Sequence, residues 1–345
     1  MTAPALPVRT HGRLFLVKLS LVVPAFNEEG ALPELLARVQ DVLESLPADW
    51  EVVVVDDGST DGTWPVIEAA AQRDERVRGI RLSRNFGHQV ALTAGLSSAT
   101  GDQIVTMDGD LQHPPETIPA LVEKAAEGFD VVYAVRSQSD VEGAFKINSA
   151  RLFYRTVNLL TSLDLPVGGA DFRLMSRRVV DALLLMPERH RFLRGMTRWV
   201  GFPQASVEYN RDARFQGQSK YTLRAMVRLA IDAIVGFSAL PLRLASMLGI
   251  LLAFLGSLYF LYVIGVRLFS DSAVEGWTSV VGVTLVLGGV QLACIGIIGQ
   301  YLGRMYDELK NRPLYVVQAE TERSAAVARA ADGPARQPAG PLSRS

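Results

Sequence analysis

The sequence predicts an α/β protein: a Rossmann-like domain built on a mostly parallel sheet, then amphipathic helices at a membrane surface and a C-terminal hairpin of two transmembrane helices. Three observations support this prediction. Short runs rich in valine, isoleucine and leucine alternate with segments of helical spacing between residues 19 and 135. Acidic clusters follow three of these runs, and two long stretches near the C-terminus carry no charge.

The alternating part of the chain defines the predicted sheet and its covering helices. The apolar runs are continuous rather than alternating, which is typical of strands covered on both faces. We therefore expect strands at 19–23, 52–55, 77–82, 103–107 and 131–135. The segments between them have helical spacing and predict helices at 30–46, 62–74, 86–99 and 115–127.

Composition excludes several classes of protein. The 35 basic and 36 acidic side chains give a net charge of −1, which argues against a nucleic-acid partner. The single cysteine, Cys294, excludes an internal disulfide framework and a cysteine zinc site. Residues 1–18 form a predicted N-terminal extension, and their one apolar run is too short for a signal-peptide core. The N-terminal half is therefore expected to fold in the cytoplasm.

The two charge-free stretches predict a membrane hairpin. Leu244–Val266 and Trp277–Gly303 each exceed the ~20 apolar residues that span a bilayer. We expect transmembrane helices at 241–269 and 277–303, the alternative being two helices buried in a soluble core. Arginines and lysines flank the hairpin, whereas its short loop holds Asp271 and Glu275. The positive-inside rule therefore places both termini in the cytoplasm.

Further segments next to the hairpin have their own character. Residues 220–240 predict a basic amphipathic helix at the membrane interface, and 145–163 has a similar pattern, with ordinary amphipathic helices of the globular domain as the alternative. Residues 304–318 form a predicted cytoplasmic segment with a short strand at Pro313–Val317, a candidate for pairing with a second copy of the chain. The tail at 319–345 is predicted to be disordered.

Acidic side chains gather where the predicted strands end. Because the carboxyl ends of parallel strands meet at one edge, these clusters are expected to converge there. Several carboxylates at one edge repel one another unless a cation compensates, and a divalent ion with oxygen ligands, completed by a diphosphate, is the natural partner. A simple turn at 108–110 and a helix cap at Asp61 are the alternatives. The carboxylates are Asp56, Asp57, Asp61, Asp108 and Asp110. The chain lacks the glycine patterns of dinucleotide-binding folds and P-loops.

Five segments together resemble one enzyme family. The segments are PAFNEE (24–29), VDDGSTDGT (55–63), DGDLQHPPE (108–116), GGADFRLMSRR (168–178) and RFQGQSKY (214–221). They resemble family 2 glycosyltransferases of the GT-A fold, specifically the polyprenyl-phosphate glycosyltransferases. These include dolichyl-phosphate mannose synthases and bacterial undecaprenyl-phosphate glucosyl and aminoarabinosyl transferases. The resemblance implies a GT-A catalytic domain at 19–219.

The same resemblance implies an activity and a location. It implies inverting transfer of a sugar from a nucleotide-sugar, a UDP-sugar by bacterial analogy, to a polyprenyl phosphate, with Mg²⁺ or Mn²⁺ as cofactor. The enzyme would be a multi-pass protein of the bacterial inner membrane with its catalytic domain at the cytoplasmic face, where it meets the lipid bilayer. A homo-oligomer is an open expectation.

Residue roles follow from the matching positions. The resemblance assigns Pro24, Ala25, Asn27 and Glu28 to the nucleotide pocket and Asp57 to the base or ribose. It assigns Asp108 and Asp110 to the metal-binding D-x-D pair, with Asp110 as the direct ligand and Gln112 beside it. It assigns Arg136 to phosphate, and Arg214 and Lys220, with Ser219 between them, to closure over the donor diphosphate.

Asp171 occupies the position usually given to the catalytic base. A phosphate monoester has a second pKa near ~6 and is mostly dianionic at neutral pH, so strong base catalysis is unnecessary. We expect Asp171 to orient the acceptor while Arg136 and Arg173 offset its charge, the alternative being a turn or helix-cap acid.

Two other functions are the alternatives. A processive polysaccharide synthase would carry a Q-x-x-R-W motif, but no glutamine stands three residues before Arg198-Trp199, and two spans are few for a polymer channel. An inactive membrane scaffold that binds a nucleotide-sugar is the other alternative.

Overall fold

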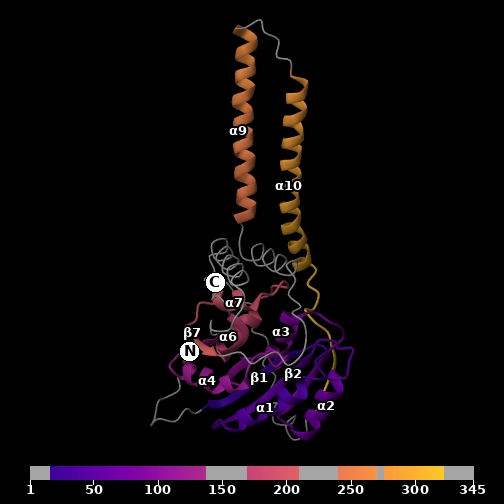
Figure 1. The fold of residues 1–345 in the computed structure, drawn as a ribbon, viewed down its shortest axis with the longest axis vertical. Coiled ribbons are helices and arrows are strands. Elements are labelled where there is room, and N and C mark those ends of the chain that lie inside the picture. The colour runs from indigo at the N-terminus through magenta and orange to yellow at the C-terminus, as the bar shows by residue number, and fades with distance from the viewer. Residues whose placement is uncertain (1–15, 137–168, 210–239, 270–275, 322–345) are drawn as a thin grey trace, which may run out of the picture.

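The computed structural model describes residues 16–136, 169–209, 240–269 and 276–321. Its described part is one mixed sheet with helices on both faces and two long helices that project from the domain (Figure 1). Several predictions fall outside the described residues: the 145–163 helix, the 220–240 helix except its last residue, and Arg214, Ser219 and Lys220.

The sheet has eight strands in the order β7-β5-β6-β4-β1-β2-β3-β8. Pairs β1–β2, β1–β4, β2–β3 and β5–β7 are parallel, whereas β6 runs antiparallel to both of its neighbours and β8 runs antiparallel to β3. The prediction of a mostly parallel α/β sheet is therefore confirmed. The strands are β1 Leu16–Ala25, β2 Ala48–Asp56, β3 Val77–Leu82, β4 Gln103–Thr106, β5 Val131–Arg136, β6 Gly169–Ser176, β7 Gln204–Tyr209 and β8 Val317–Glu320.

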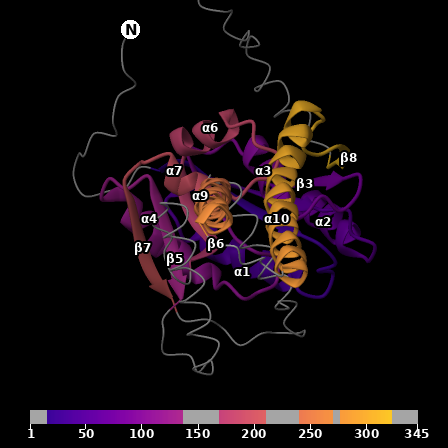
Figure 2. The same ribbon diagram turned by 90° about the horizontal axis from the view of Figure 1, so that it is seen from above.

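The helices form two layers, one on each face of the sheet. The helices α1 Leu32–Glu44, α2 Thr63–Arg73 and α4 Ile118–Ala126 bury their apolar residues in one core. The helices α3 His88–Ser98, α6 Arg177–Leu185 and α7 Leu193–Trp199 bury theirs in the other. The second layer lies on the side of the sheet that faces the long helices (Figures 1 and 2).

Helix α1 shows how the sequence pattern produces an element. Its buried residues are Leu32, Leu35, Val39 and Leu43, whose three- and four-residue spacing forms a single apolar stripe. A proline stands in the first turn, where its missing N–H costs no helical hydrogen bond. All four predicted helices are present within a few residues, although the last is divided into a short 3₁₀ turn, η1 Pro115–Thr117, and α4.

Two strands and two helices of the domain were not predicted. Strand β6 lies between β4 and β5 in the middle of the sheet, yet it carries Asp171 and Arg173 at buried positions. These charges interrupt the apolar run by which the other interior strands are recognised. Strand β7 is an edge strand with an alternating, partly exposed pattern, which is a weaker signal than a continuous apolar run. The sequence patterns also did not predict α6 and α7.

The hairpin helices are α9 Leu240–Phe269 and α10 Trp277–Leu309. Segments Leu240–Tyr259 and Val286–Leu309 are long and apolar enough to cross a membrane, and none of either candidate span is buried. Ile250 is 71% exposed and Leu292 is 72% exposed, so the alternative of two buried core helices is wrong. The two helices touch where the Cys294 thiol donates to the Ala245 carbonyl at 3.9 Å.

The C-terminal segment corrects two predicted boundaries. The short strand is Val317–Glu320 instead of the predicted Pro313–Val317. It pairs with β3 of the same chain, whereas the prediction made it a candidate for pairing with a second copy. Thr321 continues this contact, since its N–H donates to the Gly79 carbonyl at 3.0 Å. The predicted disordered tail therefore starts too early at 319. At the other end, β1 begins at Leu16, inside the predicted 1–18 extension.

Candidate active site

The loop after β1 is tied to the loop after β2. Asn27 has φ +56°, a left-handed conformation that asparagine tolerates better than most residues. Its backbone N–H donates to Ser59 Oγ at 3.0 Å, and its side-chain oxygen accepts from Thr60 N–H at 2.9 Å. The Glu28 N–H donates to Thr63 Oγ1 at 2.9 Å. Two predicted nucleotide-pocket residues, Asn27 and Glu28, thus lie beside the second loop, directly after Pro24 and Ala25 at the end of β1.

Two of the predicted cation-binding carboxylates form hydrogen bonds within the loop between β2 and α2. Asp56 accepts from Ser59 N–H at 2.8 Å and pairs with Arg81 at 3.3 Å. Asp61 accepts from both the N–H and the hydroxyl of Thr63, at 3.1 and 2.6 Å, and so satisfies the first turn of α2. The alternative of Asp61 as the N-cap is wrong in position, because Gly62 is the N-cap residue, but Asp61 does bond to Thr63 in the first turn of the helix.

Asp57 holds the loop that leads into α3. Its two carboxylate oxygens accept from Phe86 N–H at 2.7 Å and Gly87 N–H at 2.9 Å. Burial raises the pKa of Asp57 above its ordinary value, and the two N–H donors offset only part of that effect. The described contacts of Asp57 are therefore structural, while its predicted contact with a base or ribose remains a prediction.

The D-x-D pair lies just beyond β4. Asp110 accepts from Gln112 N–H at 3.1 Å through one oxygen and from the Gln112 side-chain amide through the other. Between them Leu111 has φ +59°, an uncommon conformation for a bulky residue, and its side chain is buried. Burial of this leucine stabilises a tight turn that brings Asp110 and Gln112 together.

Asp108 has an oxygen that suits a cation. Asp108 Oδ1 is buried and has no hydrogen-bond partner in the described part of the chain, although His88 Nε2 lies 3.3 Å away. Its other oxygen lies 3.7 Å from His113 Nδ1. Together with Asp110 and Gln112, the donor set is dominated by oxygen, as Mg²⁺ and Mn²⁺ prefer. Among the described residues, no group of three or more acidic, histidine or cysteine side chains is arranged to hold a metal ion.

Asp171 is a buried carboxylate with side-chain donors on several sides. It accepts from Arg194 Nε at 3.1 Å, from Gln89 Nε2 at 3.1 Å and from Arg173, and it pairs with His88 Nε2 at 3.3 Å. Burial alone would raise its pKa, but the charges of Arg194 and Arg173 and the His88 hydrogen bond outweigh burial and hold the pKa well below its usual range. Asp171 lies within β6, so the turn and helix-cap alternatives are wrong.

His88 was not identified from the sequence, yet it joins the two acidic parts of the site. Its Nε2 lies 3.3 Å from Asp108 and 3.3 Å from Asp171. Burial would lower the pKa of this imidazole, but the Asp171 hydrogen bond and the charges of Asp108 and Asp171 raise it above its ordinary value. The available sequence signal was its place at the start of a helix directly after a predicted strand end.

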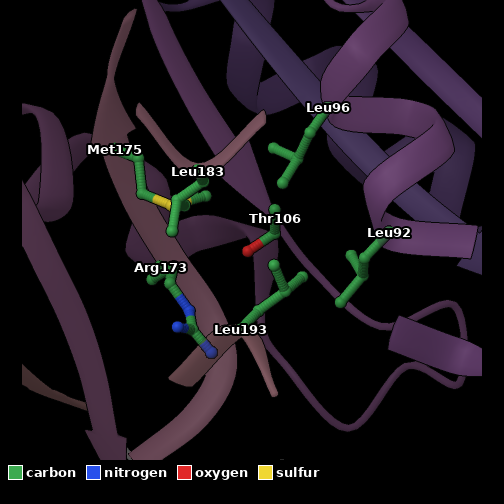
Figure 3. A pocket seen from close by; sticks show the side chains of 7 residues that line it. All are labelled: Leu92, Leu96, Thr106, Arg173, Met175, Leu183 and Leu193. Carbon is green, nitrogen blue, oxygen red and sulfur yellow. The ribbon is translucent and has the colours of Figure 1, made fainter. Parts of the chain in front are cut away.

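Arg173 is placed differently from the prediction. Its side chain is almost completely buried, donates to Thr197 Oγ1 at 3.2 Å and lies near the Tyr133 ring. Figure 3 shows Arg173 beside Leu193 and Thr106 at the edge of an apolar cavity. The free space in this cavity is too small for a water molecule. Arg173 is therefore not placed to contact an acceptor in this arrangement, because its side chain is buried and bonded to Thr197 of α7. The backbone of Arg136 ends β5, whereas its side chain lies outside the described set.

Comparisons with known proteins identify relatives along most of the chain. The model of the glycosyl transferase family 2 matches residues 20–184. An uncharacterized glycosyltransferase of Bacillus subtilis, YkcC, is 44% identical over 302 residues, covering 88% of this chain and 94% of the relative. A prophage-derived bactoprenol glucosyl transferase of Shigella flexneri is 41% identical over 302 residues, covering 88% of this chain and 98% of the relative.

A solved structure is also similar. Glucosyl-3-phosphoglycerate synthase from Mycobacterium tuberculosis, in complex with Mn²⁺, UDP and phosphoglyceric acid, is 23% identical with a TM-score of 0.45, covering 64% of this chain and 78% of that chain. This likeness is too distant to transfer residue roles.

Proposed function

The chain belongs to glycosyl transferase family 2, and from this premise we propose that it transfers a sugar from a UDP-sugar to a polyprenyl phosphate with inversion at the anomeric carbon. One observation carries the proposal: the chain aligns with nearly the whole length of relatives named bactoprenol glucosyl transferase. The same alignment disfavours a processive polysaccharide synthase, and the D-x-D pair at the sheet edge disfavours an inactive scaffold.

A divalent cation fits the D-x-D pair. Asp108 and Asp110 would hold Mg²⁺ or Mn²⁺, and diphosphate oxygens would supply ligands that the protein does not. Asp108 Oδ1, which is buried and accepts no hydrogen bond within the described part of the chain, and the oxygen-dominated donor set support this assignment. When bound, the ion would supply positive charge beside the departing diphosphate.

The chain's own residues would bind the nucleotide and the phosphate groups. The linked loops after β1 and β2 would bind the nucleotide, and Arg136, Arg214 and Lys220 would contact phosphate groups. The bond between the anomeric carbon and the diphosphate oxygen breaks, and its electron pair leaves with UDP. An acceptor phosphate oxygen forms the new bond, so a dianionic monoester becomes a monoanionic diester. No proton has to be removed from an acceptor that is already dianionic.

The membrane-anchored acceptor explains the hairpin. A polyprenyl tail is held in the bilayer by ~0.8 kcal/mol per CH₂ group, so the site has to meet the lipid at the interface. The Arg189 N–H donates to Glu308 at 2.8 Å, which ties the loop between α6 and α7 to the last turn of α10. Arg243, Arg304 and Arg312 flank the charge-free segments of the two helices. We infer a cytoplasmic catalytic domain and cytoplasmic termini in a bacterial inner membrane.

The test is transfer by the full-length protein in nanodiscs. Radiolabelled UDP-glucose and undecaprenyl phosphate are supplied with Mn²⁺ or Mg²⁺, and label entering the organic phase is counted. We expect transfer that EDTA abolishes and that Asp110→Asn lowers by about 100-fold, the scale of losing one electrostatic contact to the leaving group. Asp102→Asn, an exposed acid at the opposite end of β4, should transfer as wild type does.

Absence of lipid-linked label with any of a panel of nucleotide-sugars would overturn the proposed function. Transfer that is equally fast in EDTA would overturn the metal assignment alone.

A further inference from the structure

We propose that His113 is a positioning residue for the metal site: its Nδ1–H donates to Asp108 Oδ2 and so orients the carboxylate that holds the cation. The inference rests on the proposed function, because it concerns the metal pair of that reaction. The sequence patterns gave roles to Asp108, Asp110 and Gln112 in the DGDLQHPPE segment, and none to His113.

His113 has a buried nitrogen that the fold leaves without a partner. Its side chain is 8% exposed, and Nδ1 forms no hydrogen bond within the described part of the chain. A buried polar atom in this state destabilises a fold, so its presence calls for a reason such as a bound ion or a role in the site. Nδ1 lies 3.7 Å from Asp108 Oδ2, somewhat beyond the ~3.2 Å limit of a good hydrogen bond. A small rotation of the carboxylate would therefore pair the two groups.

Aromatic packing sets the direction of the imidazole. The Phe172 ring stacks on it, with centroids 5.3 Å apart and planes at 26°. The Tyr209 ring meets it edge-on at 6.0 Å. Phe172 comes from β6 and Tyr209 ends β7, so two strands hold the ring in place. A side chain that is already confined loses little rotamer freedom when it donates a hydrogen bond, which favours the contact with Asp108.

The backbone around His113 is restricted on both sides. Two residues earlier, Leu111 has φ +59° and a buried side chain. Directly after it stands Pro114, and a residue that precedes proline is restricted to extended backbone. The tight turn at Leu111 thus brings the chain back toward Asp108, five residues earlier, and the proline prevents His113 from continuing into a helical turn.

The two oxygens of Asp108 have different surroundings. Oδ1 is buried and accepts no hydrogen bond from the described residues, although His88 Nε2 lies 3.3 Å away and equally close to Asp171. Oδ2 is the oxygen near His113. Metal-binding carboxylates commonly accept a hydrogen bond from a neighbouring group that fixes their orientation. With Oδ2 held by His113, Oδ1 stays available for the cation. A neutral imidazole with its proton on Nδ1 suffices, so the assignment needs no charge on His113.

Mn²⁺ binding tests this assignment without any turnover. Full-length protein in nanodiscs with UDP is titrated with Mn²⁺, and the free ion is followed by its EPR signal. We expect His113→Phe, which keeps a stacking ring but has no N–H, to weaken Mn²⁺ binding by about 10- to 100-fold. UDP binding in EDTA should stay unchanged. His190→Phe is the matched control and should bind Mn²⁺ as wild type does, because His190 is 46% exposed and lies 3.8 Å from Asp307, at the end of α10.

Two amide variants separate positioning from packing. An asparagine amide nitrogen can take the place of Nδ1, whereas the longer glutamine places its amide near the position of Nε2. We therefore expect His113→Asn to bind Mn²⁺ more tightly than His113→Gln, and this pair decides the assignment if His113→Phe fails to fold. A histidine that serves packing alone predicts a lower melting temperature for the metal-free His113→Phe protein at unchanged Mn²⁺ affinity, and that result would overturn the proposal.

The failures are distinguishable. Wild type that binds Mn²⁺ with UDP, and a His113→Phe variant of equal affinity, overturn this assignment and leave the proposed function standing. A nitrogen coordinated directly to Mn²⁺ in wild type and lost in His113→Phe, detected by pulsed EPR, also overturns it, because His113 would then be a ligand. Wild type that binds no Mn²⁺ overturns the metal assignment as well. Failure of the proposed function itself is measured separately, as absence of lipid-linked label in the transfer assay.

Discussion

Glu51 is the centre of a buried polar cluster near the amino-terminal end of β2, at the end of the sheet away from the candidate active site. It accepts from Ser20 Oγ at 2.6 Å and from the N–H and hydroxyl of Thr100, at 2.6 and 2.8 Å. Lys18 lies 3.4 Å and Arg78 3.8 Å from its carboxylate. The cluster thereby holds the turn before β4 against β1 and β2.

Replacing Glu51 by alanine should be strongly destabilising. It removes the acceptor for one buried donor, Ser20, and for two partly buried donors on Thr100, together with a carboxylate that neutralises Lys18 and Arg78, and breaking such a cluster typically costs ~3–5 kcal/mol. For a domain of this size each kcal/mol corresponds to ~2–4 °C, so we expect the melting temperature to fall by roughly 6–20 °C. Glu44→Gln is the matched control, because Glu44 forms an exposed pair with Arg76 that is worth less than ~1 kcal/mol.

The same carboxylate predicts a pH dependence with a definite sign. Burial would raise the pKa of Glu51, but the hydrogen bonds from Ser20 and Thr100 and the Lys18 charge lower it below its ordinary value. A depressed folded-state pKa stabilises the fold above the unfolded pKa of ~4.3 and loses this effect as the pH falls through the folded value. Wild type should therefore lose melting temperature below about pH 4.3 more steeply than Glu51→Gln does.

Differential scanning fluorimetry of the full-length protein in detergent, from pH 3 to pH 8, provides both measurements. A Glu51→Ala protein that melts within about 2 °C of wild type at pH 7 would refute the reasoning, since ~0.5–1 kcal/mol is the scale of a surface substitution. Parallel acid profiles for wild type and Glu51→Gln would refute the pH argument separately.

Three further substitutions test other parts of the structure. Gly58→Ala should lower the melting temperature by at least about 4 °C, because its Cβ would lie 2.4 Å from the Arg84 backbone; Gly128→Ala, which also has positive φ but meets nothing within 4 Å, should lower it less. Asp57→Ala should reduce both stability, by ~2–4 kcal/mol, and transfer, because it leaves two loop N–H groups unpaired beside His88; a fully active, equally stable variant would contradict this. Glu308→Ala should leave UDP binding unchanged and lower transfer to lipid phosphate, because it unties the domain from α10; equal transfer would show that this contact does not orient the domain.

Local patterns predicted most of the elements. Strands β1 to β5 and helices α1 to α4 appear as apolar runs and helical stripes, because each buries residues at its own period against the sheet. The long apolar helices α9 and α10 were recognisable from length and composition alone. Helix α10 continues to Leu309, beyond its predicted end at Gly303. Charged residues mark the end of the membrane-spanning segment, but they do not end the helix.

Long-range pairing determined what the local patterns did not show. Strand β6 carries Asp171 and Arg173 into the sheet interior, where each charge is stabilised by a partner distant in sequence, such as Arg194 on α7. Residues 313–317 were predicted as a strand because they are apolar. The segment that forms hydrogen bonds with β3 is 317–320 instead. Among the five clustered carboxylates, hydrogen bonds from nearby loops occupy Asp56, Asp57 and Asp61, and this occupation cannot be read from spacing.

By itself, the sequence determined the class of the sheet, the two apolar helices and the D-x-D pair, because these depend on residue type and short-range periodicity. Only the tertiary structure decided which charges are buried and which stay partly exposed. Antiparallel pairing of β6 with β4 places Arg173 opposite Thr106, where its side chain is 2% exposed, whereas the Arg194 side chain on α7 is 28% exposed. The physical reason is that the burial and partners of an ionisable group are set by chain segments far away in sequence, and these determine whether its charge stabilises the fold or acts on a ligand.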